Sequence, residues 1–245
     1  MPQPLPETIT SLRDFYAFEQ HVATARANRG LPMIAEWYEI PVFYFSNHQA
    51  IYHHEDIVPQ PAYTQQLDYE LEIAFVIGKA GINIPAAEAM DYIAGYTIMN
   101  DWSARDVQRH EMRVGLGPAK GKDFGTSLGP QLITPAEIED RRIGTGAETR
   151  YDLAMVARIN GQELSRGNTK DITFTFAQMI ERASADVMLL PGDVFGSGTV
   201  GSGCLLELGG EQSALGRWLQ PGDVVELEIE RLGVLRNTVG KPRSI

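Results

Sequence analysis

The chain has 245 residues, of which 43% are hydrophobic and 9% aromatic, a composition that supports one large domain or a domain with a small N-terminal appendage. The formal charge of -11 and the isoelectric point near 4.9 argue against nucleic acid and anionic membrane surfaces as partners, because the average field repels both. The single cysteine, Cys204, excludes an intrachain disulfide and a thiolate-cluster metal site, and its apolar neighbours place it in the core. With neither a basic start nor an apolar run of membrane-spanning length, we expect a soluble protein of the cytoplasm.

The opening section predicts a helix and then a short strand. Ser11 and Asp14 have the spacing of a capping box, with Asp in place of the usual Glu, ahead of a helical pattern that stops at Gly30. We therefore expect a helix over about 12–28. A proline then introduces an apolar run at 42–45 that is typical of a strand.

Two strand-like runs carry three acidic residues. In the run 67–77 apolar residues alternate with acidic ones, so Glu70 and Glu72 share a face. The apolar run 93–99 is followed by Asp101 at a strand-to-helix junction. Three carboxylates of this kind suit a hard divalent cation, which takes oxygen ligands.

Cationic and amide groups follow the acidic residues. Arg105 and Gln108 lie three apart on a helical stretch and face the same direction. Lys122 lies in a glycine-rich loop at 115–129. These groups are placed to hold an oxygen-rich substrate beside the cation. Farther along, Glu207 stands among apolar residues, where a carboxylate needs a partner.

Each of these residues also has an ordinary explanation. Glu70 and Glu72 fit the solvent face of an amphipathic strand. Asp101 and Arg105 fit a helix N-cap and an i,i+4 ion pair, and Lys122 fits a surface lysine. Taken singly, none of them establishes an enzyme.

The whole chain is rich in strands, with a few short helices. A polar connection at 53–66 is the best boundary, which divides the chain into an N-terminal subdomain (1–65) and a catalytic domain (66–245). Without regular alternation of strand and helix, the pattern predicts an α+β fold on antiparallel or mixed sheets. The remaining predicted elements are a short helix at 85–92, a strand at 151–159, a turn at Asn160-Gly161 with a partner strand, a helix at 173–183, and strands after the Pro-Gly-Asp turns at 191–193 and 221–223.

At this point the sequence resembles the fumarylacetoacetate hydrolase family, nearly from end to end. The type is the short bacterial one, without the extra N-terminal domain of the animal hydrolase. The matching stretches are Glu70-x-Glu72, NDWSARDVQ at 100–108, LGP at 116–118, GKDFGTSLGP at 121–130 and GSGTV at 196–200.

The resemblance implies a mixed β-roll, a homodimer, and a divalent cation, Mg²⁺ or else Mn²⁺ or Ca²⁺. The metal ligands that it implies are Asp14, Glu70, Glu72 and Asp101. The catalytic residues that it implies are His21 as general base, Glu207 as the acid that orients it, and Arg105, Gln108 and Lys122 as groups that stabilise an enolate. The substrate contacts that it implies are Tyr16, Arg29, Tyr44 and Thr199.

These observations predict a hydrolase that cleaves a carbon–carbon bond in a β-diketo acid, of the fumarylacetoacetate or acylpyruvate type, through an enolate held at the metal. Such a small dicarbonyl acid belongs to the catabolism of aromatic amino acids or aromatic compounds. One alternative is a decarboxylase or isomerase of a small oxo-acid, such as oxaloacetate or 2-hydroxyhepta-2,4-diene-1,7-dioate, for which enolate stabilisation alone suffices. Another is a metal-binding family member without catalytic activity.

The N-terminal section 1–65 is expected to act as a lid. On an ideal helix Asp14 and His21 lie two turns apart, about 10 Å, on nearly the same face. One element would then reach both the metal and the attacking water, and we expect it to become ordered when substrate binds.

Overall fold

A computed structural model describes residues 3–243 of the chain. The strands of its larger sheet are β1 Ser11–Phe15, β2 Phe43–Ser46, β3 Ile51–Tyr52, β6 Leu71–Ile77, β7 Ile93–Asp101, β9 Thr126–Ile133 and β14 Asp193–Gly196. The strands of its smaller sheet are β4 Ile57–Pro59, β12 Ala154–Ile159, β13 Gln162–Asn168, β15 Val224–Ile229 and β16 Gly233–Gly240. Two short strand pairs are β5 Leu67–Asp68 with β8 Ser103–Ala104, and β10 Arg142–Ile143 with β11 Arg150–Tyr151. The α-helices are α1 Glu19–Ala27, α2 Arg105–Glu111 and α3 Phe176–Ser184. Short 3₁₀ helices are Ala35–Tyr38, Ala89–Tyr92, Pro135–Arg141, Gly146–Glu148, Thr169–Asp171 and Gly210–Gln212.

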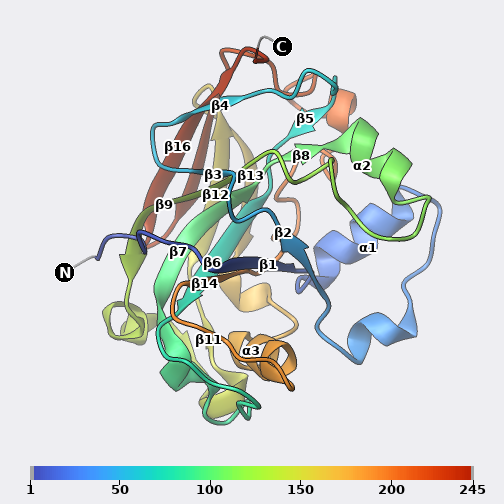
Figure 1. Cartoon of the computed structure of the whole chain (residues 1–245). Helices are drawn as coiled ribbons and strands as arrows, with labels where there is room; N and C mark the ends of the chain where they lie inside the picture. Colours follow the sequence, from blue (N-terminus) through green and yellow to red (C-terminus); the bar gives the residue numbers. More distant parts are fainter. Residues whose placement is uncertain (1–2, 244–245) are drawn as a thin grey trace.

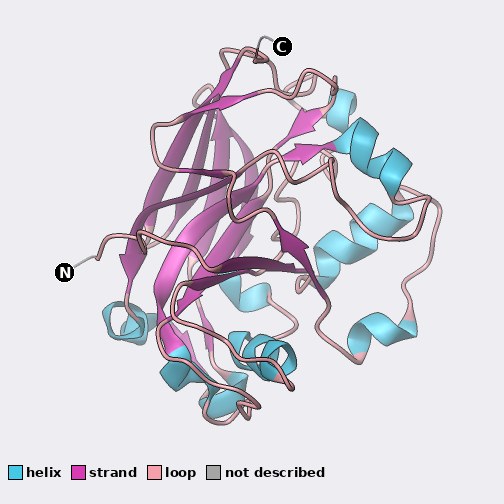
Figure 2. Ribbon diagram, in the orientation of Figure 1, coloured by secondary structure: helices cyan, strands magenta, loops and turns pink. Residues whose placement is uncertain are grey.

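Both large sheets mix parallel and antiparallel pairing. The seven-stranded sheet has the order β2-β1-β14-β6-β7-β9-β3, and the five-stranded sheet has the order β13-β12-β15-β16-β4. The pairs β1–β14, β3–β9 and β16–β4 are parallel, and the other pairs within these two sheets are antiparallel. Figures 1 and 2 show the strands gathered at the centre, with α1 and α2 together on one side and α3 at the bottom of the view. The predicted α+β class with mixed sheets is therefore confirmed.

The two sheets share one core. All seven residues of β6 are buried. The apolar side chains on one face, from Leu71 to Ile77, belong to a cluster that also includes residues of β12, β15 and α3, whereas Ala74 and Val76 on the other face belong to a second cluster with residues of β1 and β14. Burial on both faces explains why an acidic residue in this strand meets other protein groups and not water. None of the helices between residues 3 and 243 has the length and apolarity that a membrane span requires.

Local sequence signals explain several elements. Asn160 and Gly161 have positive φ angles of 52° and 80°, as a two-residue turn of type I′ requires, and this turn joins β12 to β13. Thr175 caps α3 by accepting a hydrogen bond from the backbone of Gln178. The Pro-Gly-Asp turns precede β14 and β15 as predicted.

The helix predicted at 12–28 is wrong in its first third. Residues 11–15 form β1, which pairs with β2 on one side and β14 on the other, and α1 begins only at Glu19. The hydroxyl of Ser11 donates a hydrogen bond of 2.6 Å to Asp193 and does not cap a helix. Tertiary strand pairing thus overrides the local capping signal. Asp14 and His21 therefore lie on different elements.

The strand predicted at 67–77 is interrupted. Residues 67–68 pair with β8, whereas β6 starts at Leu71 and pairs with β7. Glu70 lies in the break, and its backbone N–H donates to the side chain of Asn100 at 2.9 Å. The helix predicted at 85–92 is a single 3₁₀ turn over its last four residues.

The division of the chain at about residue 65 stays a prediction. Strands of the first section, β1, β2 and β3, belong to the seven-stranded sheet, and β4 belongs to the five-stranded one. The proposed lid section therefore shares both large sheets with the remainder of the chain.

Candidate active site

Adjacent strands of the larger sheet bring acidic side chains together. Asp14 on β1 is paired with Gly196 on β14, and Glu72 on β6 is paired with Met99 on β7, two residues before Asp101. A Cβ atom at position 196 would lie 2.6 Å from an Asp14 oxygen and 2.9 Å from a Glu72 oxygen. Glycine at this position therefore leaves the space in which the carboxylates meet.

The acidic cluster consists of Asp14, Glu70, Glu72 and Asp101. One carboxylate oxygen of each lies within 4.8 Å of the others, and all four residues are buried. Within residues 3–243, Glu72 Oε1 and Asp101 Oδ1 have no hydrogen-bond partner. Buried carboxylate oxygens without donors are the ligands that a hard divalent cation prefers, so this donor set fits such an ion. The alternative that the two glutamates face solvent is wrong.

The negative charges of the cluster perturb one another. Burial, and then the charge of Asp14, raises the pKa of Glu72 well above its usual range. Burial, and then the charge of Asp101, does the same for the pKa of Asp14. Both carboxylates accept the backbone N–H of Gly198, at 3.0 Å for Glu72 and 3.2 Å for Asp14. A dication would relieve this repulsion and favour the ionised forms.

Lys122 and Tyr44 contact the cluster. The Lys122 ammonium donates to Glu70 at 2.5 Å and to Asp101 at 2.6 Å, and the Tyr44 hydroxyl donates to the same Asp101 oxygen at 2.6 Å. Burial disfavours the Lys122 charge, but the attraction of Asp101 and Glu70 prevails and raises the pKa of Lys122. The ordinary explanation of Lys122 as a surface lysine is wrong, because the residue is 3% exposed.

Arg105 is fixed by two buried carboxylates. Its Nε donates to Asp68 at 2.8 Å, its Nη2 to Glu70 at 2.7 Å, and its Nη1 to the Gln108 side chain at 3.0 Å. The expected i,i+4 ion pair with Asp101 does not occur in this network, and the N-cap of α2 is Ala104. Burial would raise the pKa of Glu70, yet the charges of Lys122 and Arg105 lower it. The cationic groups therefore hold Glu70 ionised.

His21 and Glu207 form a hydrogen-bonded pair. His21 Nδ1 lies 2.7 Å from Glu207 Oε2, and Glu207 Oε1 accepts the backbone N–H of Ser202 at 3.0 Å. The histidine comes from α1 and the glutamate from the turn after β14, and both side chains are buried. Arg105, which donates to Glu70 of the acidic cluster, also donates to Asp68, and Asp68 accepts the backbone N–H groups of the two residues just before Glu207. These contacts connect the pair to the acidic cluster.

The other predicted site residues surround this pair and the cluster. The Tyr16 ring makes an edge contact with His21 at 5.4 Å between centroids. Burial raises the pKa of Tyr16 to about 12, although the charge of Arg29 acts in the opposite direction. Arg29 itself is exposed, and its Nε donates to a carbonyl of α1. Thr199 follows Gly198, and its buried hydroxyl has no partner among the described residues.

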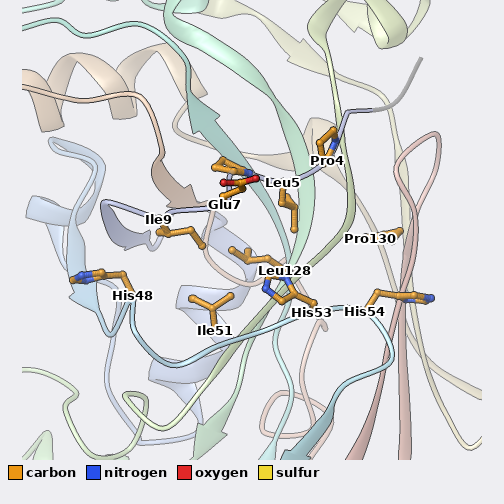
Figure 3. Close-up of a pocket in the computed structure, with 11 residues that line it drawn as sticks. Pro4, Leu5, Glu7, Ile9, His48, Ile51, His53, His54, Leu128 and Pro130 are labelled. Carbon is orange, nitrogen blue, oxygen red and sulfur yellow. The ribbon is translucent and has the colours of Figure 1, made fainter.

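One pocket is lined by residues that contact the acidic cluster. A pocket of about 270 Å³ is lined by Tyr44, Lys122, the adjoining residues 45–47, and 118, 119 and 123. A larger pocket of about 540 Å³ lies between the N-terminal segment and β3 and β9, and Figure 3 shows His48 and His54 on opposite sides of it. None of the predicted site residues lines the larger pocket, so we assign it no catalytic role.

A family model confirms the resemblance seen in the sequence. The model of the fumarylacetoacetate (FAA) hydrolase C-terminal domain matches residues 10–240. The chain belongs to the fumarylacetoacetate hydrolase family. The acidic cluster, Lys122 and the His21–Glu207 pair all fall inside the matched region.

Two relatives of similar sequence are both named as oxaloacetate tautomerases. Oxaloacetate tautomerase YisK of Bacillus subtilis is 32% identical over 203 residues, which are 82% of this chain and 62% of that protein. The human mitochondrial oxaloacetate tautomerase is 37% identical over 187 residues, which are 75% of this chain and 54% of that protein. The chain thus spans less than two thirds of either relative.

Solved structures share the fold across nearly the whole chain. The 5-carboxymethyl-2-hydroxymuconate delta-isomerase of Mycobacterium smegmatis has a TM-score of 0.74 and 27% identity, and the match covers 99% of this chain and 83% of that one. The fumarylpyruvate hydrolase of Pseudomonas aeruginosa, solved with Mn²⁺ and pyruvate, has a TM-score of 0.76, 20% identity and coverage of 98% and 96%. At that identity the second likeness concerns the fold alone.

Sequence reasoning missed two residues of the network. Asp68 is fully buried, and besides Arg105 it accepts the backbone N–H groups of Leu205 and Leu206 at 2.8 and 3.0 Å. In the sequence Asp68 alternates with apolar residues as Glu70 and Glu72 do. This alternation alone does not indicate that Asp68 binds an arginine. Cys204 is buried as predicted, yet its Sγ lies 3.5 Å from Glu207 Oε2. Its apolar sequence neighbours concealed this contact.

Proposed function

We propose that the protein is a divalent-metal-dependent hydrolase that cleaves a carbon–carbon bond in a β-diketo acid, of the acylpyruvate or fumarylacetoacetate type. The observation that carries the proposal is the His21–Glu207 pair, which the Arg105 and Asp68 hydrogen bonds connect to the acidic cluster. Handling an enolate needs only cationic groups, whereas hydrolysis also needs a base for water. This arrangement supplies both.

The metal ligands in this proposal are the four carboxylates of the acidic cluster. A bound Mg²⁺, Mn²⁺ or Ca²⁺ supplies Lewis acidity toward the carbonyl oxygens of a chelating substrate. The choice of Mg²⁺ among these ions stays a prediction, as do the homodimer, the cytoplasmic location and the link to aromatic catabolism.

The proton needed for cleavage moves through His21. Since His21 Nδ1–H donates to Glu207, its Nε2 carries the lone pair that accepts a proton from water. The hydroxide formed adds to the acyl carbonyl, the adjacent carbon–carbon bond breaks, and its electron pair delocalises into an enolate. The imidazolium then returns the proton to the enolate carbon, which releases a carboxylic acid and an oxo-acid. Glu207 stabilises the imidazolium in the meantime.

The cationic side chains stabilise the enolate. Lys122 has three donors, of which Glu70 and Asp101 take two, so one is left for a substrate oxygen. Arg105 is held in place by Asp68 and Glu70, and Gln108 adds an amide beside it. The pocket that Tyr44 and Lys122 line holds the substrate in this proposal, and Thr199 binds its carboxylate.

The test is hydrolysis of an acylpyruvate, of fumarylpyruvate and of fumarylacetoacetate by the Mg²⁺-loaded protein. His21→Ala should lower kcat by about 10² to 10⁴, the usual contribution of a general base. The matched control is His110→Ala, which removes an exposed histidine of α2 and should leave kcat unchanged. Full turnover by His21→Ala would exclude the role of His21 as base.

A second candidate, tautomerisation or decarboxylation of a small oxo-acid, is favoured by the tautomerases at 32% and 37% identity. An assay with oxaloacetate distinguishes this candidate from the hydrolase. Loss of enol absorbance, or release of CO₂, in a protein that cleaves none of the diketo acids would replace the hydrolase proposal. Binding of Mg²⁺ without any turnover would instead indicate a metal-binding protein without catalytic activity.

A further inference from the structure

A second group of metal-ligating side chains shares no residue with the acidic cluster. His21, Cys204 and Glu207 each offer one ligand atom, and these atoms lie within 4.8 Å of one another. The donors meet at one oxygen, since Glu207 Oε2 is 2.7 Å from His21 Nδ1 and 3.5 Å from Cys204 Sγ. Across residues 3–243 this is the one such group that combines nitrogen, sulfur and oxygen.

We propose that His21, Cys204 and Glu207 bind a thiophilic divalent cation such as Zn²⁺, and that this binding switches the enzyme off. The site itself is independent of the proposed function, whereas its inhibitory effect rests on the role of His21 as the base.

The donor set selects a soft or borderline cation. Imidazole and thiolate are the ligands that Zn²⁺ prefers, whereas Mg²⁺ and Ca²⁺ take oxygen ligands and keep to sites such as the acidic cluster. We therefore expect Zn²⁺ to prefer His21, Cys204 and Glu207, and Mg²⁺ or Ca²⁺ to prefer the acidic cluster.

Charge balance also favours a dication at this site. Cys204 is completely buried, and without a metal a buried thiol favours its neutral, protonated form. Binding replaces that proton, which passes to solvent. A thiolate, a carboxylate, a neutral imidazole and a dication then sum to zero charge, which a buried site tolerates.

The geometry needs only small shifts. Zn²⁺ lies about 2.0–2.3 Å from such ligands, which places tetrahedral donors roughly 3.3–3.7 Å from one another. The His21–Glu207 separation of 2.7 Å would widen by roughly 0.6–1.0 Å, whereas the Cys204–Glu207 separation of 3.5 Å already lies in this range. Three protein ligands leave a fourth position for water.

Binding at this site would remove the base. The cation would bind His21 Nδ1 and so replace the hydrogen bond through which Glu207 stabilises the imidazolium. A dication beside the ring also opposes protonation of Nε2. Added Mg²⁺ cannot restore activity, because it competes for different ligands.

The experiment measures binding and activity separately. Cysteine occurs once in the chain, so a thiolate-to-metal charge-transfer band on addition of Co²⁺ to the Mg²⁺-loaded protein reports Cys204 alone. We expect this band at one equivalent, its loss in Cys204→Ser, and a Zn²⁺ affinity at least about 100-fold weaker in that variant. Zn²⁺ should lower wild-type turnover by about 10² or more despite excess Mg²⁺.

Two controls keep the outcome interpretable. His54→Gln removes an exposed histidine beside the surface pocket and should leave the band and the Zn²⁺ affinity unchanged. Thermal unfolding of Cys204→Ser, together with its metal-free circular dichroism, establishes that the variant is folded, and Cys204→Ala serves if it is not.

The possible results separate the two proposals. Absence of the charge-transfer band, equal Zn²⁺ affinity in Cys204→Ser, or inhibition that excess Mg²⁺ relieves would each overturn this inference. A normal band in a protein that hydrolyses no diketo acid would overturn the proposed function and the inhibitory effect that rests on it, and would leave the metal site itself supported.

Discussion

Glu72→Gln should stabilise the protein without metal and destabilise it with metal. In the metal-free protein a Glu72 oxygen and an Asp14 oxygen lie within 4.8 Å of each other, and the charge of Asp14 adds to burial in raising the pKa of Glu72. At an effective dielectric constant of about 20, two like charges at that distance repel by about 3.5 kcal/mol. Since one carboxyl can take up a proton instead, we expect the amide to recover about 2 kcal/mol, which raises Tm by about 4–8 °C in a chain of this size.

The amide also suits the local hydrogen bonds. One Glu72 oxygen accepts the Gly198 N–H, which glutamine retains, and the other has no partner within the described residues. An amide N–H₂ at that second position would donate to the neighbouring carboxylates of the cluster.

Calorimetric unfolding in EDTA and in saturating Mg²⁺ gives the measurement. Wild type should gain stability from Mg²⁺ through mass action, and Glu72→Gln should gain far less, so that their order reverses. The control is Glu163→Gln, which removes an exposed carboxylate paired with Arg166. If Glu72→Gln unfolds below wild type in EDTA, the repulsion argument is refuted.

Two further predictions concern the same network. Asp68→Asn should cost about 3 kcal/mol and lower Tm by about 6–12 °C, because it leaves the Arg105 guanidinium buried with one carboxylate fewer; an unchanged Tm would show that the ion pair contributes nothing. The unfolding free energy of the metal-free protein should fall as pH rises above the ordinary carboxyl pKa of about 4. Folding raises the pKa values of Asp14 and Glu72, so above the ordinary carboxyl pKa of about 4 the folded state binds more protons than the unfolded state. The free energy of unfolding is therefore highest at low pH. It falls as the pH passes through the raised pKa values and the two carboxyl groups lose their protons. Saturating Mg²⁺ should remove this fall, and a rise in EDTA over the same interval would contradict the sign.

Much of the sheet structure could be predicted from the sequence. The run 71–77, the turn at Asn160 and the Pro-Gly-Asp turns carry local signals, and the structure follows them. The opening helix failed because a local capping pattern cannot reveal that residues 11–15 pair with two strands, one of which lies about 180 residues farther along the chain. Strand order is a property of the whole fold.

The site divides in the same way. Glu70, Glu72 and Asp101 were grouped from alternation and a strand end, and these features are local. The resemblance, and not any spacing, added Asp14 and the His21–Glu207 pair. Asp68 was missed because its role depends on residues that are distant in the sequence. Only the fold reveals that its carboxylate accepts hydrogen bonds from Arg105 and from two backbone N–H groups.

The placement of the candidate groups also bears on which reaction the chain performs. Asp14, Glu72 and Asp101 come from β1, β6 and β7, within one sheet, whereas His21 and Glu207 come from α1 and a turn. Relatives named as isomerase, tautomerase and hydrolase share this fold. None of the hydrogen bonds that bind the acidic cluster to Lys122, Tyr44 and Gly198 involves His21. Replacing His21 therefore leaves the enolate-stabilising part of the site intact. A variant that loses carbon–carbon cleavage while it still enolises oxaloacetate would assign water activation to His21 on α1 and enolate stabilisation to the acidic cluster with Lys122 and Arg105.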